Sequence, residues 1–164
     1  MVVVDLGAAP GGWSQIAAER VGAGEGEGKG QVVAVDLLDL EPIAGVEMFA
    51  LDVSEEGALE RIKAALKGGL ADIVLSDMAP ATTGHRSTDH IRVVALAEAA
   101  LDLAEALLAP GGTFLAKVFQ GGAGQELMAR LKRSFAKVHH VKPKASRKES
   151  PEIYVLATGF RGSR

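Results

Sequence analysis

The chain has 164 residues, of which 48% are hydrophobic, so it is long enough to bury a core, and we expect a single domain over residues 1–164. It contains no cysteine, which excludes a disulfide framework and a thiolate-bound structural zinc and favours a reducing compartment. No apolar run reaches the roughly 18 residues that a membrane-spanning helix needs, so we expect a soluble, cytoplasmic protein.

Strand-like and helix-like segments alternate along the chain. Runs rich in Val, Ile and Leu predict strands at residues 2–6, 31–36, 46–52, 71–77, 113–119 and 153–159, with a further candidate at 136–141. Apolar residues at i, i+3 and i+4 predict helices at residues 13–21, 55–66, 89–108 and 124–135, with Ser54 and Asp89 as N-caps of the second and third. This alternation predicts an α/β fold, a mostly parallel sheet with helices on both faces.

The formal net charge of −3 hides a division between two parts of the chain. Residues 1–110 hold 7 Lys and Arg against 18 Asp and Glu, a net −11, whereas residues 111–164 hold 11 against 3, a net +8. Residues 131–148 carry seven basic residues and no acid, which predicts a face that binds RNA phosphates. The alternative is an ordinary solvated basic surface. The RNA contacts that we expect are Lys132, Arg133, Lys142, Lys144, Arg147 and Lys148.

Acidic residues close the first four predicted strands. In an open parallel sheet the ligand binds beyond the carboxyl ends of the strands. A single aspartate at such a position is usually a helix or turn cap, but four in succession predict a rim of carboxylates around one ligand. These residues are Asp5, Asp36, Asp52 and Asp77.

The corner DLGAAPGGW, residues 5–13, departs from the G-x-G-x-x-G pattern of pyrophosphate-binding dinucleotide sites. A carboxylate before the turn favours a cationic ligand, and we expect Asp5 to hold an amino group or a sulfonium-bearing tail. Glycines at 7, 11 and 12 let the backbone approach that ligand closely. With Asp36 on ribose hydroxyls and Asp52 on an adenine amine, S-adenosylmethionine is favoured and an NAD-dependent dehydrogenase is the alternative.

Two further segments indicate the acceptor. SDMAP, residues 76–80, lacks the following aromatic of enzymes that methylate base amines, because Ala81 stands there, so a hydroxyl acceptor is favoured. Lys117 lies among apolar residues of a predicted strand, where its charge is costly to bury. Either a carboxylate such as Asp77 pairs with Lys117, or the lysine is kept for function. The alternative is a lysine at the edge of the sheet whose tip reaches water. Glu152 opens the last strand, where it could also be a simple edge charge.

Five segments together resemble the FtsJ-like ribosomal RNA large subunit methyltransferase E family. They are VVDLGAAPGGWSQ, VAVDLLDLEPIAGV, LSDMAP, LAPGGTFLAKVFQG and SRKESPEIYVLATG, in this order along the chain. The likeness runs from Val2 to Gly162. The resemblance implies a Rossmann-like methyltransferase fold with a seven-stranded sheet whose last strand is antiparallel. It also implies S-adenosylmethionine as cofactor and ribose 2′-O-methylation of a uridine of 23S rRNA in the large ribosomal subunit.

The resemblance also implies roles for individual residues. The cofactor contacts that it implies are Gly12, Trp13, Asp36, Asp52 and Asp77, and we add Gly7, Gly11, Leu37 and Val53 beside them. Of the family's Lys-Asp-Lys-Glu catalytic tetrad, Asp77, Lys117 and Glu152 are present, whereas the first lysine belongs upstream of GAAPGGW, in a segment that this sequence lacks.

In this hypothesis Lys117 orients and partly deprotonates the 2′-oxygen, Asp77 fixes Lys117, and Glu152 orients the nucleotide or the lysine. Two alternatives remain: a cofactor- and RNA-binding core without catalysis, and a 2′-O-methyltransferase that acts on tRNA or mitochondrial rRNA. The four histidines (His85, His90, His139 and His140) lack metal-ligand spacing, so we expect no metal. We expect the chain to act as a monomer, without membrane contact.

Overall fold

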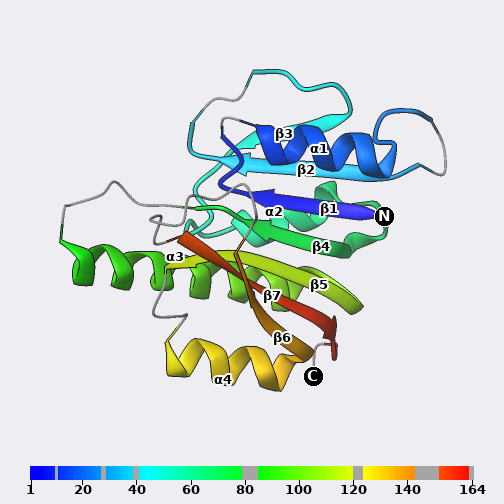
Figure 1. The fold of residues 1–164 in the computed structure, drawn as a ribbon. Coiled ribbons are helices and arrows are strands. Elements are labelled where there is room, and N and C mark those ends of the chain that lie inside the picture. Colours follow the sequence, from blue (N-terminus) through cyan, green and yellow to red (C-terminus); the bar gives the residue numbers. More distant parts are fainter. Residues whose placement is uncertain are drawn as a thin grey trace.

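Seven strands form one sheet in the computed structural model, which describes residues 1–9, 11–26, 29–38, 41–78, 85–119, 124–142 and 152–162 (Figure 1). The strands are β1 (Val2–Leu6), β2 (Gln31–Asp36), β3 (Val46–Ala50), β4 (Ala71–Ser76), β5 (Leu108–Phe119), β6 (Phe135–Val141) and β7 (Glu152–Phe160). Their order is β3-β2-β1-β4-β5-β7-β6, and only β7 runs antiparallel to its neighbours. The expected mostly parallel sheet of seven strands, with the last strand antiparallel, is confirmed.

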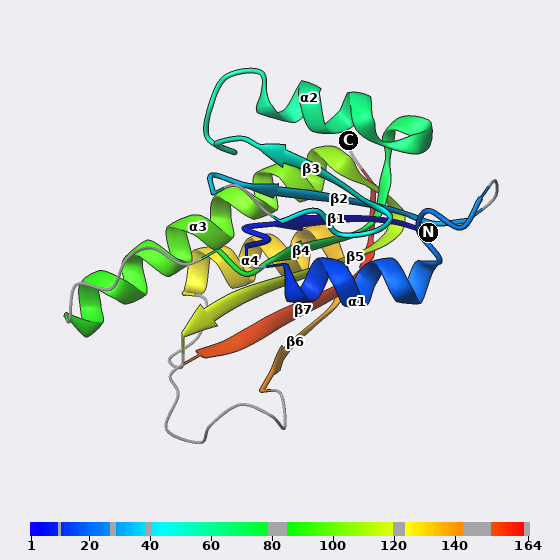
Figure 2. The same ribbon diagram turned by 90° about the horizontal axis from the view of Figure 1, so that it is seen from above.

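Helices cover both faces of the sheet, as the alternating pattern predicts (Figure 2). Helix α1 (Gly12–Val21) lies on one face, where Ala18 packs with Val3 and Val32. The other face carries α2 (Ala58–Ala65), α3 (Arg86–Leu107) and α4 (Gln125–Ser134), whose apolar residues join the main core. A short 3-10 turn, Lys67–Gly69, leads into β4. None of the helices in the described residues is long and apolar enough to cross a membrane.

Alternation along the strands decides which side chains face α1. In β1, Val4 belongs to the main core, whereas Asp5 points to the α1 face and bonds to Ser14 of α1. The parallel register carries this alternation through β4 into β5. There Ala116 enters the main core, and Lys117 lies on the same face as α1.

Both predicted helix caps are wrong. Ser54 does not begin α2, because its amide and hydroxyl bond to the carboxylate of Asp52 and close a turn ahead of the helix, which starts after Gly57. Likewise Asp89 does not cap α3, because His85 is the N-cap and the Asp89 amide donates to the His85 carbonyl within the first turn. Its helix therefore begins three residues before the predicted start.

Strand β5 is longer than the sequence predicts. It begins at Leu108 rather than residue 113, and Leu108 pairs with Ala71 before the register shifts. Gly111, with φ of 87°, lies within this irregular start. Strand β3 is shorter and ends at Ala50, which leaves Asp52 in the following turn.

Candidate active site

A groove of about 410 Å³ opens where the carboxyl ends of the central parallel strands meet. Most of the residues that the sequence assigns to cofactor binding line it, together with a lysine that the sequence analysis predicts to be catalytic. They are Gly7, Asp36, Leu37, Asp52, Val53, Asp77 and Lys117. Gly11, Gly12 and Trp13 are not among the lining residues; they form the start of α1.

The glycine corner after β1 needs a residue without a side chain. Gly7 has φ of 71°, and a Cβ there would lie 2.5 Å from the Cγ of Met78. Its amide and that of Ala8 both donate to the carbonyl of Val35, which ties the corner to β2. This close approach brings the backbone of the corner against the groove.

Asp36 braces the same corner from the end of β2. One carboxylate oxygen accepts the amide of Ala9 at 2.8 Å, and the other accepts the amide of Leu38 at 2.9 Å. Each oxygen keeps capacity for a further donor, because a carboxylate offers about four lone-pair sites. Asp36 can therefore hold the corner and accept from a ligand at once.

Asp52 lies across the groove in the turn after β3. The Ser54 hydroxyl, at 2.6 Å, and the Ser54 amide hold the pKa of Asp52 below its ordinary value. Asp52 thus offers a charged acceptor at the rim. Beside it Leu37 and Leu38 expose 70% and 67% of their surface, so an apolar surface adjoins the carboxylates of Asp36 and Asp52.

Asp5 lies beneath the groove rather than on its rim. Its side chain is buried against α1, and one oxygen accepts the Ser14 hydroxyl at 2.6 Å. The other oxygen, Oδ1, has no hydrogen-bond partner among the described residues. Burial raises the pKa of Asp5 to about 6; the Ser14 hydrogen bond opposes this rise, and the charges of Asp77 and Asp36 add to it. Three of the four predicted carboxylates thus line the groove, and the fourth lies below it.

Asp77, Lys117 and Glu152 converge at one end of the groove. The Nζ of Lys117 lies 2.9 Å from Oδ1 of Asp77 and 3.4 Å from Oε1 of Glu152. Only 10% of the lysine side chain is exposed, against 33% for Asp77 and 44% for Glu152. The lysine is therefore held between two carboxylates that remain open to solvent, an arrangement that leaves its charge compensated and its tip near the groove.

Sequence reasoning missed Tyr154, which belongs to this cluster. Tyr154 pairs with Lys117 across β5 and β7, and its hydroxyl donates to Asp77 at 3.3 Å. The ring centroid lies 5.4 Å from that of Trp13. Burial, together with the charges of Asp77 and Glu152, raises the pKa of this tyrosine to about 12. The signal was available, because a strand residue two positions after Glu152 shares its face.

The predicted RNA-binding residues do not share one place. Lys142 follows β6 near the groove, where its Nζ donates to the carbonyl of Glu152 at 3.3 Å. Lys132 and Arg133 lie in the last turn of α4, before β6 begins. Because six residue steps of β6 separate the two ends, these groups stand roughly 20 Å apart along the sheet. Lys144, Arg147 and Lys148, like Ala81, lie outside the described residues.

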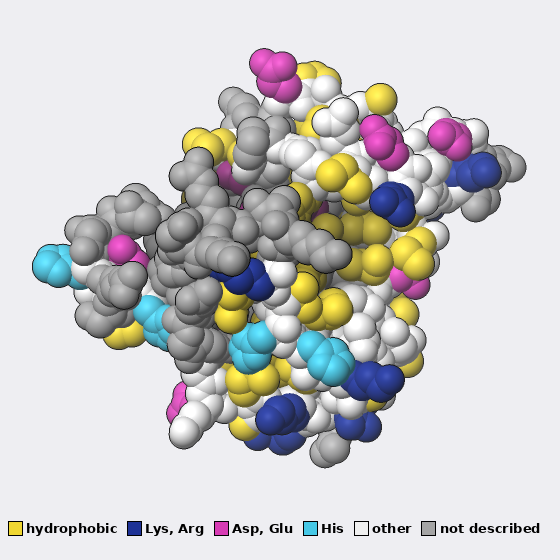
Figure 3. All heavy atoms as spheres, viewed as in Figure 1, with side chains coloured by type: hydrophobic (Ala, Val, Ile, Leu, Met, Phe, Trp, Pro, Cys, Tyr) yellow, Lys and Arg dark blue, Asp and Glu magenta, His cyan; other side chains and the backbone are white. Residues whose placement is uncertain are grey.

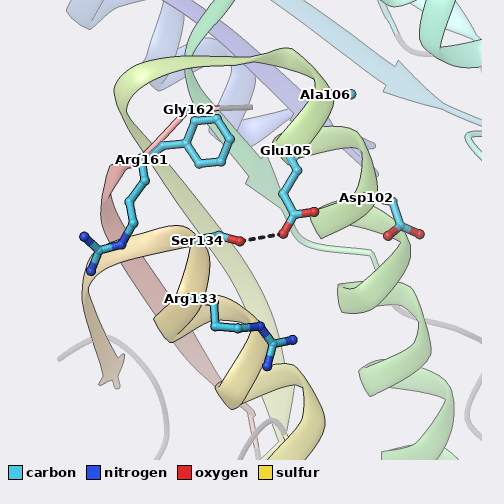
Figure 4. Close-up of a pocket in the computed structure, with 8 residues that line it drawn as sticks. Asp102, Glu105, Ala106, Arg133, Ser134, Arg161 and Gly162 are labelled. Carbon is cyan, nitrogen blue, oxygen red and sulfur yellow. Dashed lines mark hydrogen bonds between the residues drawn. The ribbon is translucent and has the colours of Figure 1, made fainter. Parts of the chain in front are cut away.

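A second hollow, of about 800 Å³, lies where α3 and α4 end, at the opposite end of the sheet (Figure 4). Its lining includes Glu105, Arg133, Ser134 and Arg161, and the Ser134 hydroxyl donates to Glu105 at 2.8 Å. None of the predicted cofactor or catalytic residues lines it. Within the described residues, no cluster of three or more His, Asp or Glu could hold a metal ion.

Comparison with known proteins identifies the family. The model of the FtsJ-like methyltransferases matches residues 1–160. A relative from Bradyrhizobium diazoefficiens, named ribosomal RNA large subunit methyltransferase E, is 62% identical over 162 residues, which cover 99% of this chain and 70% of the relative. A Plasmodium falciparum structure described as a ribosomal RNA methyltransferase superposes with a TM-score of 0.83 at 27% identity, over 98% of this chain and 87% of that one.

More distant structures share the fold alone. Human methyltransferase-like protein 13, solved in complex with SAH, superposes with a TM-score of 0.61 at 13% identity, over 96% of this chain and 71% of that one. The seven-stranded sheet with its antiparallel last strand, and the match along nearly the whole sequence, lead to one conclusion. The chain belongs to the FtsJ-like methyltransferase family.

Proposed function

We propose that this chain transfers the methyl group of S-adenosylmethionine to the ribose 2′-hydroxyl of a uridine in 23S rRNA of the large ribosomal subunit. The observation that carries the proposal is the lysine held between two carboxylates, Lys117 with Asp77 and Glu152, at the end of the groove. The names of relatives at 56–62% identity support ribosomal RNA as the substrate. We further propose that the chain acts as a monomer in the cytoplasm.

The residues of the groove fit S-adenosylmethionine. A cofactor with a sulfonium and an amino group suits an acidic rim, and Asp36 and Asp52 are acceptors suited to its ribose hydroxyls and its adenine amine. Leu37 and Val53 offer apolar surface to the adenine ring. The Oδ1 of Asp5, which lacks a hydrogen-bond partner in the described part of the chain, is a buried acceptor near the glycine corner, where an amino group would satisfy it. When bound, the cofactor supplies an electrophilic methyl group.

The chemistry left to the chain is alignment of the acceptor and removal of its proton. An ammonium group has three donors, and Asp77 and Glu152 engage two of those on Lys117. The third is available to bind the 2′-oxygen and point its lone pair at the methyl group. As the new O–C bond forms, the hydroxyl becomes acidic and its proton passes to the carboxylate of Asp77, because the ammonium of Lys117 has no lone pair that could accept it. Tyr154, bonded to Asp77, fixes the orientation of that carboxylate.

The test is transfer of labelled methyl to large ribosomal subunits from a methylation-deficient source. Lys117→Ala should lower transfer by roughly 100-fold or more, because the acceptor oxygen is no longer held in line with the methyl group. Its affinity for S-adenosylmethionine should stay within a few fold. Lys63→Ala, the same change at an exposed position of α2, should transfer as the unmodified chain does.

Three outcomes would contradict parts of the proposal. Transfer that survives Lys117→Ala would remove the lysine from the mechanism, and collapse of cofactor binding would make its role structural. Cofactor binding without transfer by the unmodified chain would favour a binding core without catalysis. If the label enters tRNA but not large subunits, the proposed substrate is wrong, whereas the proposed reaction, 2′-O-methylation, still holds.

A further inference from the structure

One face of the sheet has no helix over it in the part of the chain that the structure describes. Helix α1 packs on β1 and β2, and α2, α3 and α4 lie on the opposite face. Beyond β4, no helix of the described residues lies over the α1 side of β7 and β6, apart from the contact of Trp13, at the start of α1, with Tyr154. We call this the β7–β6 face and define it by Tyr154, Leu156, Thr158, Val141, His139 and Lys137, which the register places on the α1 side.

The β7–β6 face is continuous with the catalytic cluster. Lys117, Tyr154 and Val141 form one row across β5, β7 and β6. The next rows on this face end in His139 and then Lys137, roughly 7 and 14 Å along β6 from the row of Lys117. Nucleotides that flank a ribose held at Lys117 would lie within that range.

The charge of this face suits a polyanion. Residues 135–142 contain no acid, and Lys137, His139 and Lys142 are exposed. Figure 3, viewed from the α1 side, shows Lys, Arg and His side chains gathered along the lower part of the molecule, beside hydrophobic side chains toward α1. The apolar members Leu156 and Val141 offer contacts to bases or sugars, so the face combines cations with apolar surface.

The other basic residues lie elsewhere. Lys132 and Arg133 belong to α4, whose Leu127 and Leu131 pack into the core on the side of the sheet opposite to α1. They also stand at the end of the sheet away from Lys117. A strand that enters the catalytic cluster across the β7–β6 face would not reach them.

We propose that the RNA strand flanking the target nucleotide lies across the β7–β6 face, with Lys137 and His139 binding its phosphates. This inference rests on the proposed function for the position of the target ribose. It separates the basic residues into two groups: those of β6 contact substrate RNA, and those of α4 do not.

The test compares two identical charge reversals. Lys137→Glu and Lys132→Glu are both exposed substitutions, and methyl transfer to large subunits is measured as kcat and KM for each. Lys137→Glu should raise KM at least tenfold with little change in kcat, and Lys132→Glu should change neither by more than about twofold. Lys137→Ala should lower the slope of log affinity against log salt by about 0.7, the loss of one single-strand phosphate contact. Cofactor affinity should be unchanged in all three.

Equal KM values for the two charge reversals would overturn the proposal. A larger increase in KM for Lys132→Glu would indicate that RNA binds at α4 instead. Binding of a labelled RNA hairpin with a uridine-containing loop, measured by fluorescence anisotropy, separates this inference from the proposed function. If the unmodified chain binds the hairpin but transfers no methyl group, the proposed function is wrong. The same variants then still test whether RNA binds the β7–β6 face. If Lys137→Glu leaves the affinity for the hairpin unchanged, the proposal that RNA binds the β7–β6 face is wrong, whatever the result for methyl transfer.

Discussion

Asp5 is a carboxylate whose ionisation opposes folding. It is 1% exposed, and only Ser14 donates to it among the interactions of the described residues. Burial raises its pKa from 3.8 to about 6, and Asp77 and Asp36 contribute in the same direction. Because the folded state keeps the proton longer than the unfolded state, the stabilisation is complete below about pH 3.8 and is lost as pH rises through 6. The loss amounts to roughly 3 kcal/mol of unfolding free energy.

Asp5→Asn should remove this dependence. The asparagine carbonyl can still accept from Ser14, but the side chain no longer ionises. In urea unfolding, the stability of the unmodified chain relative to Asp5→Asn should fall by roughly 2 kcal/mol between pH 4 and pH 7. Ser14→Ala provides the control, because without its donor the pKa of Asp5 should rise further and the loss should move to higher pH. Parallel pH profiles for the unmodified chain and Asp5→Asn would contradict the argument.

At the scale of elements, one arginine joins α4 to α3. The guanidinium of Arg130 contacts both oxygens of Glu105, at 3.2 and 2.7 Å, and lies 2.6 Å from Asp102. These bonds raise the pKa of Arg130, the Glu105 hydrogen bond contributing most. Ser134 adds a hydroxyl donor to the same Glu105. The fork geometry holds the two helices side by side beyond what their apolar contacts provide.

Arg130→Ala should therefore lower the free energy of unfolding by about 1–2 kcal/mol, a value reduced by the 68% exposure of Asp102. Arg130→Lys should recover only part of the loss, since an ammonium cannot form the fork. Arg133→Ala changes a neighbouring exposed residue of the same helix and should shift stability by less than about 0.5 kcal/mol. Chemical denaturation measures the free energy of unfolding of all three variants. Equal losses for Arg130→Ala and Arg133→Ala would show that the contacts of Arg130 with Glu105 and Asp102 do not stabilise the pair of helices.

The sequence predicts which elements exist better than where they begin. The apolar run of β2 predicts a strand clearly, and every residue from Val32 to Val35 is buried in the structure. The start of α3 was missed because Asp89 has the chemistry of a cap, and nothing local to the sequence shows that His85 would take that place. The antiparallel direction of β7 likewise depends on packing against β5, and only the family resemblance indicated it.

The candidate site divides in the same way. Asp36, Asp52 and Asp77 could be predicted because the carboxyl ends of parallel strands share one edge. The depth of Asp5 could not, because it depends on α1 covering the end of β1. The separation of Lys132 from Lys142 was also hidden, since the basic stretch appears continuous until β6 carries its two ends to opposite ends of the sheet.

The acidic and the basic part of the sequence contribute residues to different surfaces of the molecule. The acidic residues 1–110, with a net charge of −11, contribute Asp36, Asp52 and Asp77 to the groove. Residues 111–164, with a net charge of +8, contribute Lys117 and the cations of β6. Lys117 lies where the two regions meet, so a cationic cofactor and a polyanionic substrate can approach the reacting atoms from sides of opposite charge.

This division predicts that salt affects the two ligands differently. S-adenosylmethionine meets the groove through a few hydrogen bonds and a small net charge, so its affinity should change by less than about twofold between 50 and 200 mM salt. RNA binding releases counterions, and with the two phosphate contacts proposed for Lys137 and His139 its affinity should fall with a log–log slope of roughly −1.4. Calorimetry with the cofactor and fluorescence anisotropy with a labelled RNA hairpin measure both on one preparation. If RNA affinity were as insensitive to salt as cofactor affinity, RNA binding would not depend on the cations of residues 111–164. Contacts between cations and phosphates release counterions and therefore make the affinity fall with salt.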